Sequence, residues 1–351
     1  EETDIKNLLE YAEGQIFEIN QRRVKKEVTK VGDVVADVIS RINNAAQQEG
    51  GYTGLRTGFT KLDEKTNGWQ PATLNIIAAR PAMGKTAFVL SMAKNMAIDY
   101  GYPVAIFSLE MSNLELVNRL VINASEIEGE KIKTGRLTPH EWQDLYAKTD
   151  CLNSAPIFID DTANISVSEL TTKARRLKSE HDIQCIIIDY LQLMNASGMS
   201  YGSREQEVSI ISRSLKGLAK ELDIPVIALS QLNRGVESRE EKRPQLSDLR
   251  ESGAIEQDAD MVVFIHRPEY YKIMQDQEGN SNEGVAEIII AKHRSGAVGD
   301  VRLQFTKELI KFSNLTERRY GNYQADTSSY QEFGNKYNEP MPIQPSSVDP
   351  F

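Results

Sequence analysis

Between residues 73 and 229, short apolar runs alternate with longer segments whose apolar residues recur every three or four positions. The runs are nearly continuous in hydrophobicity, which is typical of strands buried on both faces of a sheet, and the longer segments have the periodicity of amphipathic helices. We expect the strands at 73–79, 103–109, 157–160, 185–188 and 226–229. This order predicts the α/β class, in which helices cover both faces of a mostly parallel sheet.

The pattern changes after residue 260, where strand-like runs follow one another without long helices between them. These runs lie at 261–265, 285–291 and 301–305. The last two are joined by a turn that contains glycine, which predicts an antiparallel hairpin. We expect this hairpin at the C-terminal edge of the sheet.

The two ends of the chain look peripheral to this domain. A helix is expected at 4–20, and a second possible helix carries Val35, Val38 and Ile42 before a linker rich in glutamine and glycine. The apolar stripe of the first helix must be buried either on its own domain or on a neighbouring subunit. Near the C-terminus, Asn, Tyr, Ser, Gln and Pro dominate without periodicity. We therefore expect a linker helix and linker at 1–50, one large domain at 51–313 and a disordered tail at 314–351.

The 351 residues include 41 Lys and Arg against 51 Asp and Glu, which gives a formal net charge of −10. This acidic balance argues against a dominant basic face for nucleic acid, although a local basic channel is compatible with it. Cys151 and Cys185 cannot form a disulfide framework. No apolar run approaches ~18 residues, so we expect no membrane segment and a cytoplasmic location. Because the first residue is Glu1 rather than Met, we interpret the sequence as a piece of a longer protein.

The strongest chemical signal is an eight-residue phosphate-binding pattern that follows the first strand and opens a helix. Its residues are Ala79, Arg80, Pro81, Ala82, Met83, Gly84, Lys85 and Thr86. In such a loop, backbone N–H groups and the helix N-terminus face the phosphates, the lysine supplies a cation and the hydroxyl can ligate magnesium. Ala79 stands where the pattern has glycine, which is compatible with the loop if the backbone there tolerates a methyl group.

Three polar residues follow apolar strands at the edge where ligands bind in open α/β sheets. Asp189 follows the strand at 185–188, where a second nucleotide motif would hold magnesium, although such an aspartate alone is usually a turn or cap residue. Glu110 follows the strand at 103–109 and could deprotonate an attacking water, or could be a solvated carboxylate. Gln231 is placed to sense a γ-phosphate, with a capping amide as the alternative.

Two further segments carry cations that could act on a ligand. The loop from residue 234 to 251 holds five basic and five acidic residues and ends at a predicted helix start, where Arg250 and backbone N–H groups could bind DNA phosphates. A solvated loop of mixed charge is the alternative. Lys292 and Arg294 alternate before a turn, so both could reach a neighbour's γ-phosphate as an arginine finger, or could protect a sheet edge.

Six runs taken together resemble the family of bacterial replicative DNA helicases of the DnaB type. The runs are residues 79–86, 107–111, 188–194, 229–234, 247–260 and 288–294. The resemblance covers residues 1 to about 312 and corresponds to the linker and the RecA-like motor domain of these helicases. It leaves the family's N-terminal collar domain, which supports primase binding, without a counterpart here.

The resemblance implies a RecA-like P-loop NTPase core with ATP and Mg²⁺ as cofactors. Lys85 and Thr86 would bind ATP and magnesium, and Asp189 would support the magnesium. Glu110 would be the catalytic base, and Gln231 would sense the γ-phosphate. These roles agree with those that the residue patterns suggest.

The resemblance also implies roles between subunits and toward DNA. Lys292 and Arg294 would act in trans on the ATP of the adjacent subunit. Arg250, Glu251 and Gly253 would lie on a loop that faces DNA. These assignments predict an ATP site that is shared by two copies of the chain.

The resemblance as a whole implies a hexameric ring that encircles single-stranded DNA, translocates 5′ to 3′ and unwinds duplex at the replication fork, with a helicase loader and primase as partners. Residues 195–204 would form a second loop in the channel, and the helix at 4–20 would dock on the next subunit. Three alternatives remain open: a RecA-type recombinase, a DNA-independent ATPase of the same fold, and a small-molecule kinase with a P-loop.

Overall fold

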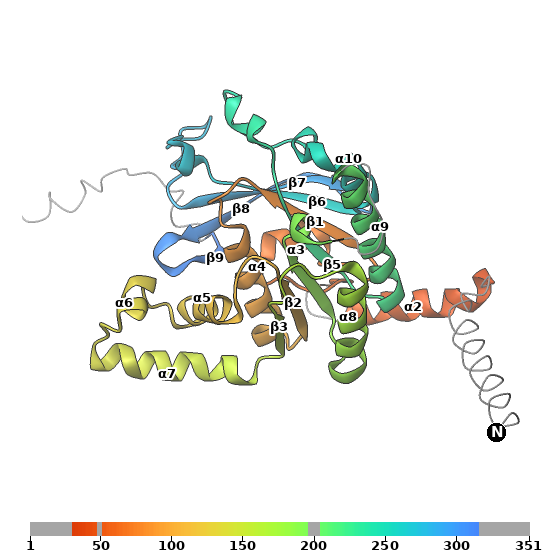
Figure 1. Ribbon diagram of the computed structural model, residues 1–351, viewed down its shortest axis with the longest axis horizontal. Coiled ribbons are helices and arrows are strands. Elements are labelled where there is room, and N and C mark those ends of the chain that lie inside the picture. Colours follow the sequence, from red (N-terminus) through yellow and green to blue (C-terminus); the bar gives the residue numbers. More distant parts are fainter. Residues whose placement is uncertain (1–29, 48–50, 196–203, 316–351) are drawn as a thin grey trace, which may run out of the picture.

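The computed structural model describes residues 30–47, 51–195 and 204–315. The helix expected at 4–20, nearly all of the segment 195–204 and nearly all of the expected tail lie outside the described residues. Figure 1 shows one sheet with helices packed along it. None of the described helices is long and apolar enough to cross a membrane.

The described residues form one nine-stranded sheet in the order β3-β2-β4-β5-β1-β6-β7-β8-β9. The strands are β1 Leu74–Ala79, β2 Val104–Ser108, β3 Ile157–Asp160, β4 Cys185–Asp189, β5 Val226–Gln231, β6 Met261–His266, β7 Val285–His293, β8 Gly299–Thr306 and β9 Lys311–Asn314. Strands β1 to β6 are parallel, and β7 to β9 extend the sheet in antiparallel order. The predicted α/β class with a mostly parallel sheet is confirmed.

The predicted antiparallel hairpin at the C-terminal side of the sheet is confirmed as β7 and β8, and strand β9, which the sequence pattern does not predict, adds one more antiparallel strand outside it. Strand β9 pairs with β8 and forms the edge of the described sheet. Its buried side chain, Phe312, packs against Phe88 of the first crossover helix and Phe305 of β8, with ring centroids 5.4 and 4.8 Å away. A four-residue strand with one buried side chain has too little alternation to stand out in a sequence.

Three of the described helices, α5, α7 and α8, begin at residues whose side chains cap the first turn. The α-helices are α2 Val31–Gln47, α3 Thr60–Thr66, α4 Lys85–Lys94, α5 Asn113–Ser125, α6 Gly129–Thr134, α7 Pro139–Ser154, α8 Val167–His181, α9 Arg204–Leu222 and α10 Gly253–Asp258. The shorter turns are η1 Asn95–Asp99 (a π-helix), and the 3₁₀-helices η2 Leu191–Leu193, η3 Arg234–Ser238, η4 Leu246–Ser252, η5 Pro268–Tyr271 and η6 Lys307–Leu309. Ser112 with Glu115 at α5, and Thr138 with Glu141 at α7, form capping boxes, which satisfy N–H groups that a first turn leaves unpaired.

Alternate residues of the central strands enter two separate hydrophobic cores. On one face of the sheet, Ile77 and Ala79 of β1 belong to the core that includes α4 and α5. On the other face, Leu74, Ile76 and Ala78 belong to the core that includes α8, α9 and α10. Successive side chains of a strand point to opposite faces, so a strand covered on both sides needs an almost wholly apolar sequence.

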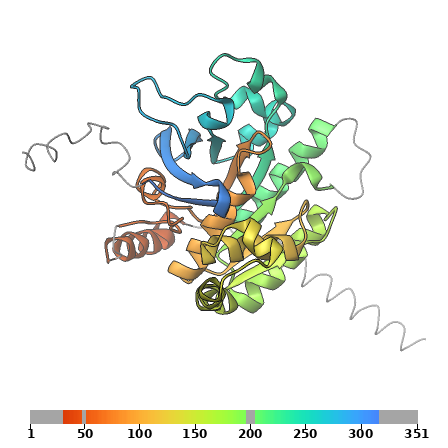
Figure 2. The same ribbon diagram turned by 90° about the vertical axis from the view of Figure 1, so that its left-hand side faces the viewer.

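Helix α2 carries an apolar stripe that the rest of the described chain leaves exposed. The members of the stripe are between 42% and 79% exposed and are Val31, Val34, Val35, Val38, Ile39 and Ile42. The helix expected around three of these residues is confirmed. Figures 1 and 2 show α2 at the rim of the domain. An apolar stripe of this size on one helix is typical of a surface that is covered in an assembly.

Candidate active site

The phosphate-binding pattern forms a loop between the last residue of β1 and the first residue of α4. Ala79 is the last residue of the strand and is 1% exposed, and the positive φ angles of the loop fall on Ala82 (66°) and Gly84 (91°). The position that usually holds glycine is therefore ordinary strand backbone here, and a methyl group is tolerated. The departure from the sequence pattern leaves the shape of the loop intact.

Gly84 is needed both for its backbone angle and for its lack of a side chain. Its φ of 91° is rarely adopted by other residues, and a Cβ there would lie 3.1 Å from a ring carbon of Phe312. Directly after it, Lys85 begins α4, whose first N–H groups have no partner within the helix. The N-terminus of a buried helix is thereby open to a negatively charged ligand.

Three predicted residues meet beside this helix start. The Thr86 hydroxyl donates to Oδ2 of Asp189 at 2.7 Å, and Nζ of Lys85 lies 3.8 Å from Oδ1. Asp189 is 1% exposed, and its Oδ1 has no hydrogen-bond donor among the described residues. A buried carboxylate oxygen without a donor is costly unless a cation binds there. One carboxylate and one hydroxyl beside a phosphate loop suit Mg²⁺, which usually takes few protein ligands and keeps waters and substrate phosphates.

Lys85 is enclosed in a way that strengthens its electrostatic effect. Burial lowers the pKa of the Lys85 amine, while the charges of Asp189 and Glu110 oppose that shift. The amine also lies 4.5 Å from the ring centre of Tyr190, the residue after Asp189. A cation held in a poorly solvated site interacts more strongly with phosphate than one in water.

Glu110 is brought to the same edge by the pairing of β2 with β4. Ser108, the last residue of β2, lies in register with Asp189, and the N–H of Leu109 donates to the Asp189 carbonyl at 2.7 Å. Glu110 follows this pair, is exposed, and stabilises the charge of Lys85. Its carboxylate is therefore available near the phosphate loop, as a catalytic base would need to be.

Gln231 lies beside the start of the loop. It is the last residue of β5 and is in register with Ala79, and the next N–H, of Leu232, donates to the Ala79 carbonyl at 3.1 Å. Gln192 donates to the hydroxyl of Ser230 at 2.8 Å and so packs against the same strand end. The side chain of Gln231 is exposed at this edge. The structure thus brings five predicted residues together at the carboxyl ends of the central strands: Lys85, Thr86, Asp189, Glu110 and Gln231.

The side chain of Arg80 binds other parts of the chain and is not free to bind phosphate. It donates to the Leu232 carbonyl at 2.8 Å and to Glu237 of η3 at 2.9 Å, and it is 8% exposed. The predicted contribution of Arg80 to ligand binding is therefore restricted to its backbone. Its side chain links the phosphate loop to the segment that follows β5.

Arg267 is a residue at this site that the sequence analysis missed. It directly follows β6, is 8% exposed and donates to the Ala82 carbonyl at 3.4 Å. Its guanidinium lies 4.0 Å from the ring centre of Phe305, and burial lowers its pKa. The signal that could have found it is its position directly after a buried strand at the ligand edge.

Lys292 and Arg294 lie at the opposite ends of the central strands, where β1 and β6 begin. Because β7 is antiparallel to β6, Lys292 pairs with Val262, close to the amino end of β6. Arg294 N–H donates to the Asp260 carbonyl at 2.8 Å, and the Asp260 carboxylate accepts from Leu74 N–H, at the start of β1, at 2.8 Å. The phosphate loop follows the other end of β1, roughly 17 Å away at about 3.3 Å per residue.

This position excludes contact with the phosphate loop of the same chain, and it excludes the alternative of edge protection. Lys292 and Arg294 cannot reach the phosphate loop of their own chain across the length of β1. Protection of a sheet edge is wrong too, because β7 lies between β6 and β8. Both side chains donate to backbone carbonyls of α10, Lys292 to Glu256 and Arg294 to Gln257, so they point to the same side as expected.

Several charged residues of the loop from residue 234 to 251 form ion pairs within the loop or with the sheet. Arg239 pairs with Asp248 inside the loop, and Arg243 pairs with Glu287 of β7 and Asp300 of β8. Arg250 and Glu251 lie in η4, and Gly253 begins α10, so the predicted helix start is confirmed. The side chains from residue 250 to 254 lie outside the described ones.

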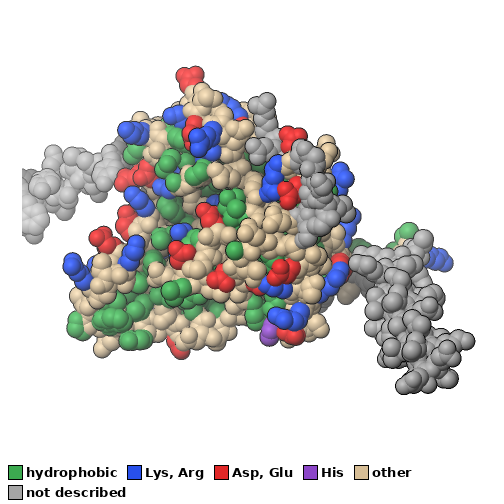
Figure 3. All heavy atoms as spheres, in the orientation of Figure 1, with side chains coloured by type: hydrophobic (Ala, Val, Ile, Leu, Met, Phe, Trp, Pro, Cys, Tyr) green, Lys and Arg blue, Asp and Glu red, His purple; other side chains and the backbone are tan. Residues whose placement is uncertain are grey.

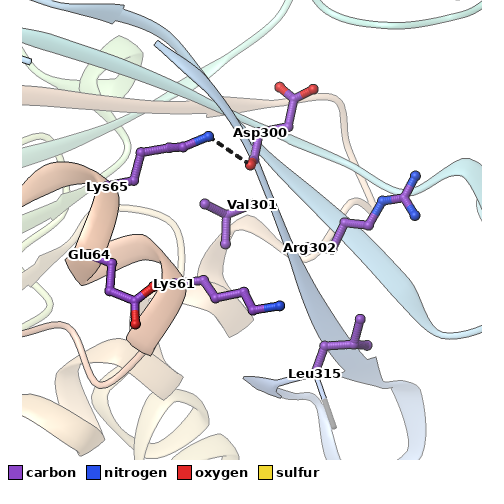
Figure 4. A pocket seen from close by; sticks show the side chains of 7 residues that line it. All are labelled: Lys61, Glu64, Lys65, Asp300, Val301, Arg302 and Leu315. Carbon is purple, nitrogen blue, oxygen red and sulfur yellow. Dashed lines mark hydrogen bonds between the residues drawn. The ribbon is translucent and has the colours of Figure 1, made fainter. Parts of the chain in front are cut away.

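A separate pocket lies between α3 and β8, and none of the phosphate-loop residues lines it. Its volume is about 540 Å³, and Figure 4 shows that Lys65 and Asp300 approach each other across it, with Lys65 Nζ donating to the Asp300 carbonyl at 3.2 Å. The lining residues are Lys61, Glu64, Lys65, Asp300, Val301, Arg302 and Leu315. This set shares no residue with the site at the phosphate loop.

Comparison with known proteins identifies the family. The family model described as "DnaB-like helicase C terminal domain" matches residues 54–314. The chain belongs to the DnaB-like helicases. It is 49% identical over 319 residues to the replicative DNA helicase DnaB of Geobacillus stearothermophilus, covering 91% of this chain and 69% of that protein. It is 48% identical, with the same coverage, to the replicative DNA helicase DnaC of Bacillus subtilis.

Two solved structures have the same fold as this chain. One is described as an ATPase domain and superposes with a TM-score of 0.76 at 41% identity, covering 83% of this chain and all of that one. The other is a DnaB-like replicative helicase described with its interactions with primase, and it gives a TM-score of 0.73 at 39% identity, covering 89% of this chain and 74% of that one. The predicted DnaB-like helicase family and the RecA-like fold are therefore confirmed, and the comparisons give no support to the recombinase or the DNA-independent ATPase. The roles of the individual site residues stay predictions.

Proposed function

We propose that this DnaB-like helicase chain is the ATP-hydrolysing motor of a hexamer that encircles single-stranded DNA and moves 5′ to 3′ to unwind duplex at the replication fork. The observation that carries this proposal is the placement of two half-sites on opposite edges of one sheet. Lys85 and its neighbours would form one half, and Lys292 with Arg294 would form the other. An ATP site completed by two copies follows naturally from that arrangement.

Within one subunit, the residues at the phosphate loop would prepare ATP for attack. The loop N–H groups and Lys85 would hold the phosphates, and Thr86 with Asp189 would hold Mg²⁺. Bound Mg²⁺ would supply neutralisation of the charge on the β- and γ-phosphates. Glu110 would orient a water molecule and accept its proton, and Gln231 would report the presence of the γ-phosphate to the segment that follows β5.

The neighbouring subunit would supply the finger. Lys292 and Arg294 of that copy would contact the γ-phosphate, where positive charge stabilises the transition state. Hydrolysis would remove this contact and let the two subunits move relative to each other. A motor that holds DNA by its phosphates, through Arg250, Glu251 and Gly253 on the loop at η4 and α10, would be insensitive to sequence.

A ring also needs a contact that repeats from head to tail, and two exposed apolar surfaces support one. The first is the stripe of α2. The second lies on α5 and α7 and consists of Leu114, Val117, Trp142 and Tyr146, which are between 40% and 80% exposed. Figure 3 shows apolar side chains gathered where α7 lies, on the other side of the molecule from α2. We propose that residues 1–50 act as a linker that docks on the next copy. The helix expected to dock, at 4–20, lies outside the described residues, and we extend the docking proposal to the exposed stripe of α2. Two different patches on one chain give heterologous contacts, which form a ring when the rotation between copies closes.

Charges in the α2 stripe should break the assembly. The double variant Val38→Asp and Ile42→Asp places two carboxylates on the apolar face, and we expect the hexamer to fall to smaller species at micromolar concentration when measured by mass photometry. Burial of each apolar side chain contributes about 1.5–3 kcal/mol, which the charges would remove. Ser40→Asp, on the opposite face by helical periodicity, is the matched control. A hexamer that tolerates the double variant would exclude docking through α2.

The remaining parts of the proposal concern partners and organisation. We propose residues 51–313 as the motor domain and 314–351 as a tail. A helicase loader and primase are proposed partners of the full-length protein, in the bacterial cytoplasm at replication forks. Support comes from the family and, for primase, from the relative that is described with its interactions with primase.

The test of the proposed function is ATP hydrolysis and strand separation by the wild-type chain and by Lys85→Ala. We expect single-stranded DNA to stimulate hydrolysis, and a fork with a free 5′ arm to be unwound. Lys85→Ala should retain at most about one hundredth of the hydrolysis rate, because the buried cation at the phosphates is lost. Hydrolysis that ignores DNA, without unwinding, would instead favour a DNA-independent ATPase.

A further inference from the structure

The carboxylate of Asp260 lies at the base of the proposed finger and contacts three elements at once. Its Oδ1 is 3.4 Å from Nη1 of Arg294, and its backbone carbonyl accepts from Arg294 N–H at 2.8 Å. Its Oδ2 accepts from Lys216 of α9 and from the N–H of Leu74, at the start of β1, at 2.8 Å. The side chain of Asp260 is 16% exposed. Arg294 is therefore held through both its backbone and its guanidinium by one residue that is itself anchored to the sheet and to α9.

The end of α10 holds the same pair of cations. Lys292 donates to the Glu256 carbonyl, and Arg294 donates to the Gln257 carbonyl. Carbonyls in the last turn of a helix lack partners within the helix and attract positive charge. The hydroxyl of Ser212 on α9 donates to Asp258, which fixes this helix end to the domain. The side chain of Arg294 is 49% exposed, although both terminal nitrogens of its guanidinium have partners in its own chain, Asp260 and the Gln257 carbonyl.

Two neighbouring cations need this support. Burial first, and the charge of Arg294 second, lower the pKa of the Lys292 amine, whereas Glu256, Asp260 and Asp258 oppose that shift. A finger also stabilises a transition state only if its charge is in place before the reaction, since a misplacement of about 1 Å can cost about 100-fold in rate. Asp260 therefore offsets the repulsion between Lys292 and Arg294 and also fixes the position of Arg294.

We propose that Asp260 is a positioning residue that holds Arg294 in the orientation required at the neighbouring subunit's ATP. This inference rests on the proposed function, because it takes Arg294 to act in trans. Asp260 would touch neither ATP nor water. Its effect would therefore appear in the turnover of the next subunit rather than in the affinity of its own subunit for ATP.

The competing explanation is that Asp260 only stabilises the start of β1 through Leu74, and so supports the phosphate loop of its own chain. The two explanations place the defect of an Asp260 variant in different active sites. Asp260→Asn separates them well, because the amide oxygen can still accept from Leu74 N–H while the negative charge toward Arg294 and Lys216 is lost. Subunit mixing then shows which site has failed.

The experiment measures ATPase activity of Asp260→Asn alone and in equal mixtures with two other variants. Alone, we expect kcat to fall about 10- to 100-fold with the KM for ATP within about twofold of wild type. Mixed with Glu110→Gln, which keeps its finger, Asp260→Asn should regain activity at up to about a quarter of the interfaces. Mixed with Arg294→Ala, it should regain none, because both variants lack a working finger.

Opposite mixing results would overturn the inference. Activity regained with Arg294→Ala but not with Glu110→Gln would place the defect in the variant's own phosphate site, and a KM raised tenfold would do the same. The reference mixture of Arg294→Ala with Glu110→Gln tests the trans arrangement separately: if it stays inactive, the proposed function fails at that point, whatever Asp260 does.

Two further variants keep the result interpretable. Lys216→Met removes the second cation from Asp260 and leaves the Leu74 N–H bond in place, although it also removes the bond from Lys216 to the Ala72 carbonyl at 2.9 Å. It should show the same mixing pattern with a smaller loss, about threefold or more. It also serves if Asp260→Asn fails to fold, and the opposite mixing pattern in Lys216→Met would overturn the inference. Glu221→Gln, which like Lys216→Met changes a residue of α9, removes a carboxylate from the bidentate pair of Glu221 with Arg175 of α8, and should leave kcat and mixing unchanged.

Discussion

Arg294→Ala should lower kcat for ATP hydrolysis by about 10³- to 10⁵-fold while the variant still binds ATP, because a finger in trans contributes that much to phosphoryl transfer. The phosphate loop of the variant is untouched, since Arg294 lies at the other end of β1. Steady-state ATPase assays and titration with a fluorescent ATP analogue would separate turnover from binding. A loss of both would show that Arg294 supports its own ATP site.

Mixing decides whether the finger crosses a subunit boundary. In an equal random mixture, an interface is complete when an Arg294→Ala subunit supplies Glu110 and a Glu110→Gln neighbour supplies Arg294, which holds for about a quarter of interfaces in a ring. Recovery toward that level is the expected result. Arg176→Ala, which removes an exposed arginine from α8, is the control and should remain fully active. Full activity of Arg294→Ala by itself would exclude a catalytic role for it.

Glu110→Gln should lower kcat by about 10²- to 10⁴-fold without weakening ATP binding, because glutamine keeps the size of the side chain but cannot accept the proton of the attacking water. The charge of this exposed carboxylate, two residues after β2, opposes the lowering of the Lys85 pKa by burial, so Glu110 lies near the phosphate loop. The variant should trap ATP on the protein, which filter binding of labelled nucleotide would detect after a single turnover time.

Two comparisons make the result for Glu110 specific. Glu130→Gln, an exposed acid on α6, should turn over ATP at the wild-type rate. Lys85→Ala should differ from Glu110→Gln by losing affinity as well as rate, because it removes the cation that holds the phosphates. Equal activity of Glu110→Gln and wild type would exclude Glu110 as the base and leave it as a solvated strand-end residue.

The parts of the molecule that sequence alone predicts are those set by local chemistry. The central strands follow from nearly continuous apolar runs, because burial on both faces of the sheet requires them. The phosphate loop follows from eight consecutive residues, and the strand-end positions of Asp189, Glu110 and Gln231 follow from the rule that carboxyl ends of parallel strands share one edge. The pairing of Thr86 with Asp189 agrees with those predictions.

The parts that only the tertiary structure decides depend on which strands become neighbours. A sequence does not state that β7 runs antiparallel beside β6, and this pairing alone puts Lys292 and Arg294 at the edge opposite the phosphate loop. The same is true of β9, whose place is set by the packing of Phe312, and of Asp260, whose partners come from β1, α9 and the end of β7. Local patterns determined the elements and the residues gathered at the phosphate loop. Long-range pairing, which depends on packing between distant segments, decided that Lys292 and Arg294 lie at the other end of the central strands, from which we propose that they act on a neighbour.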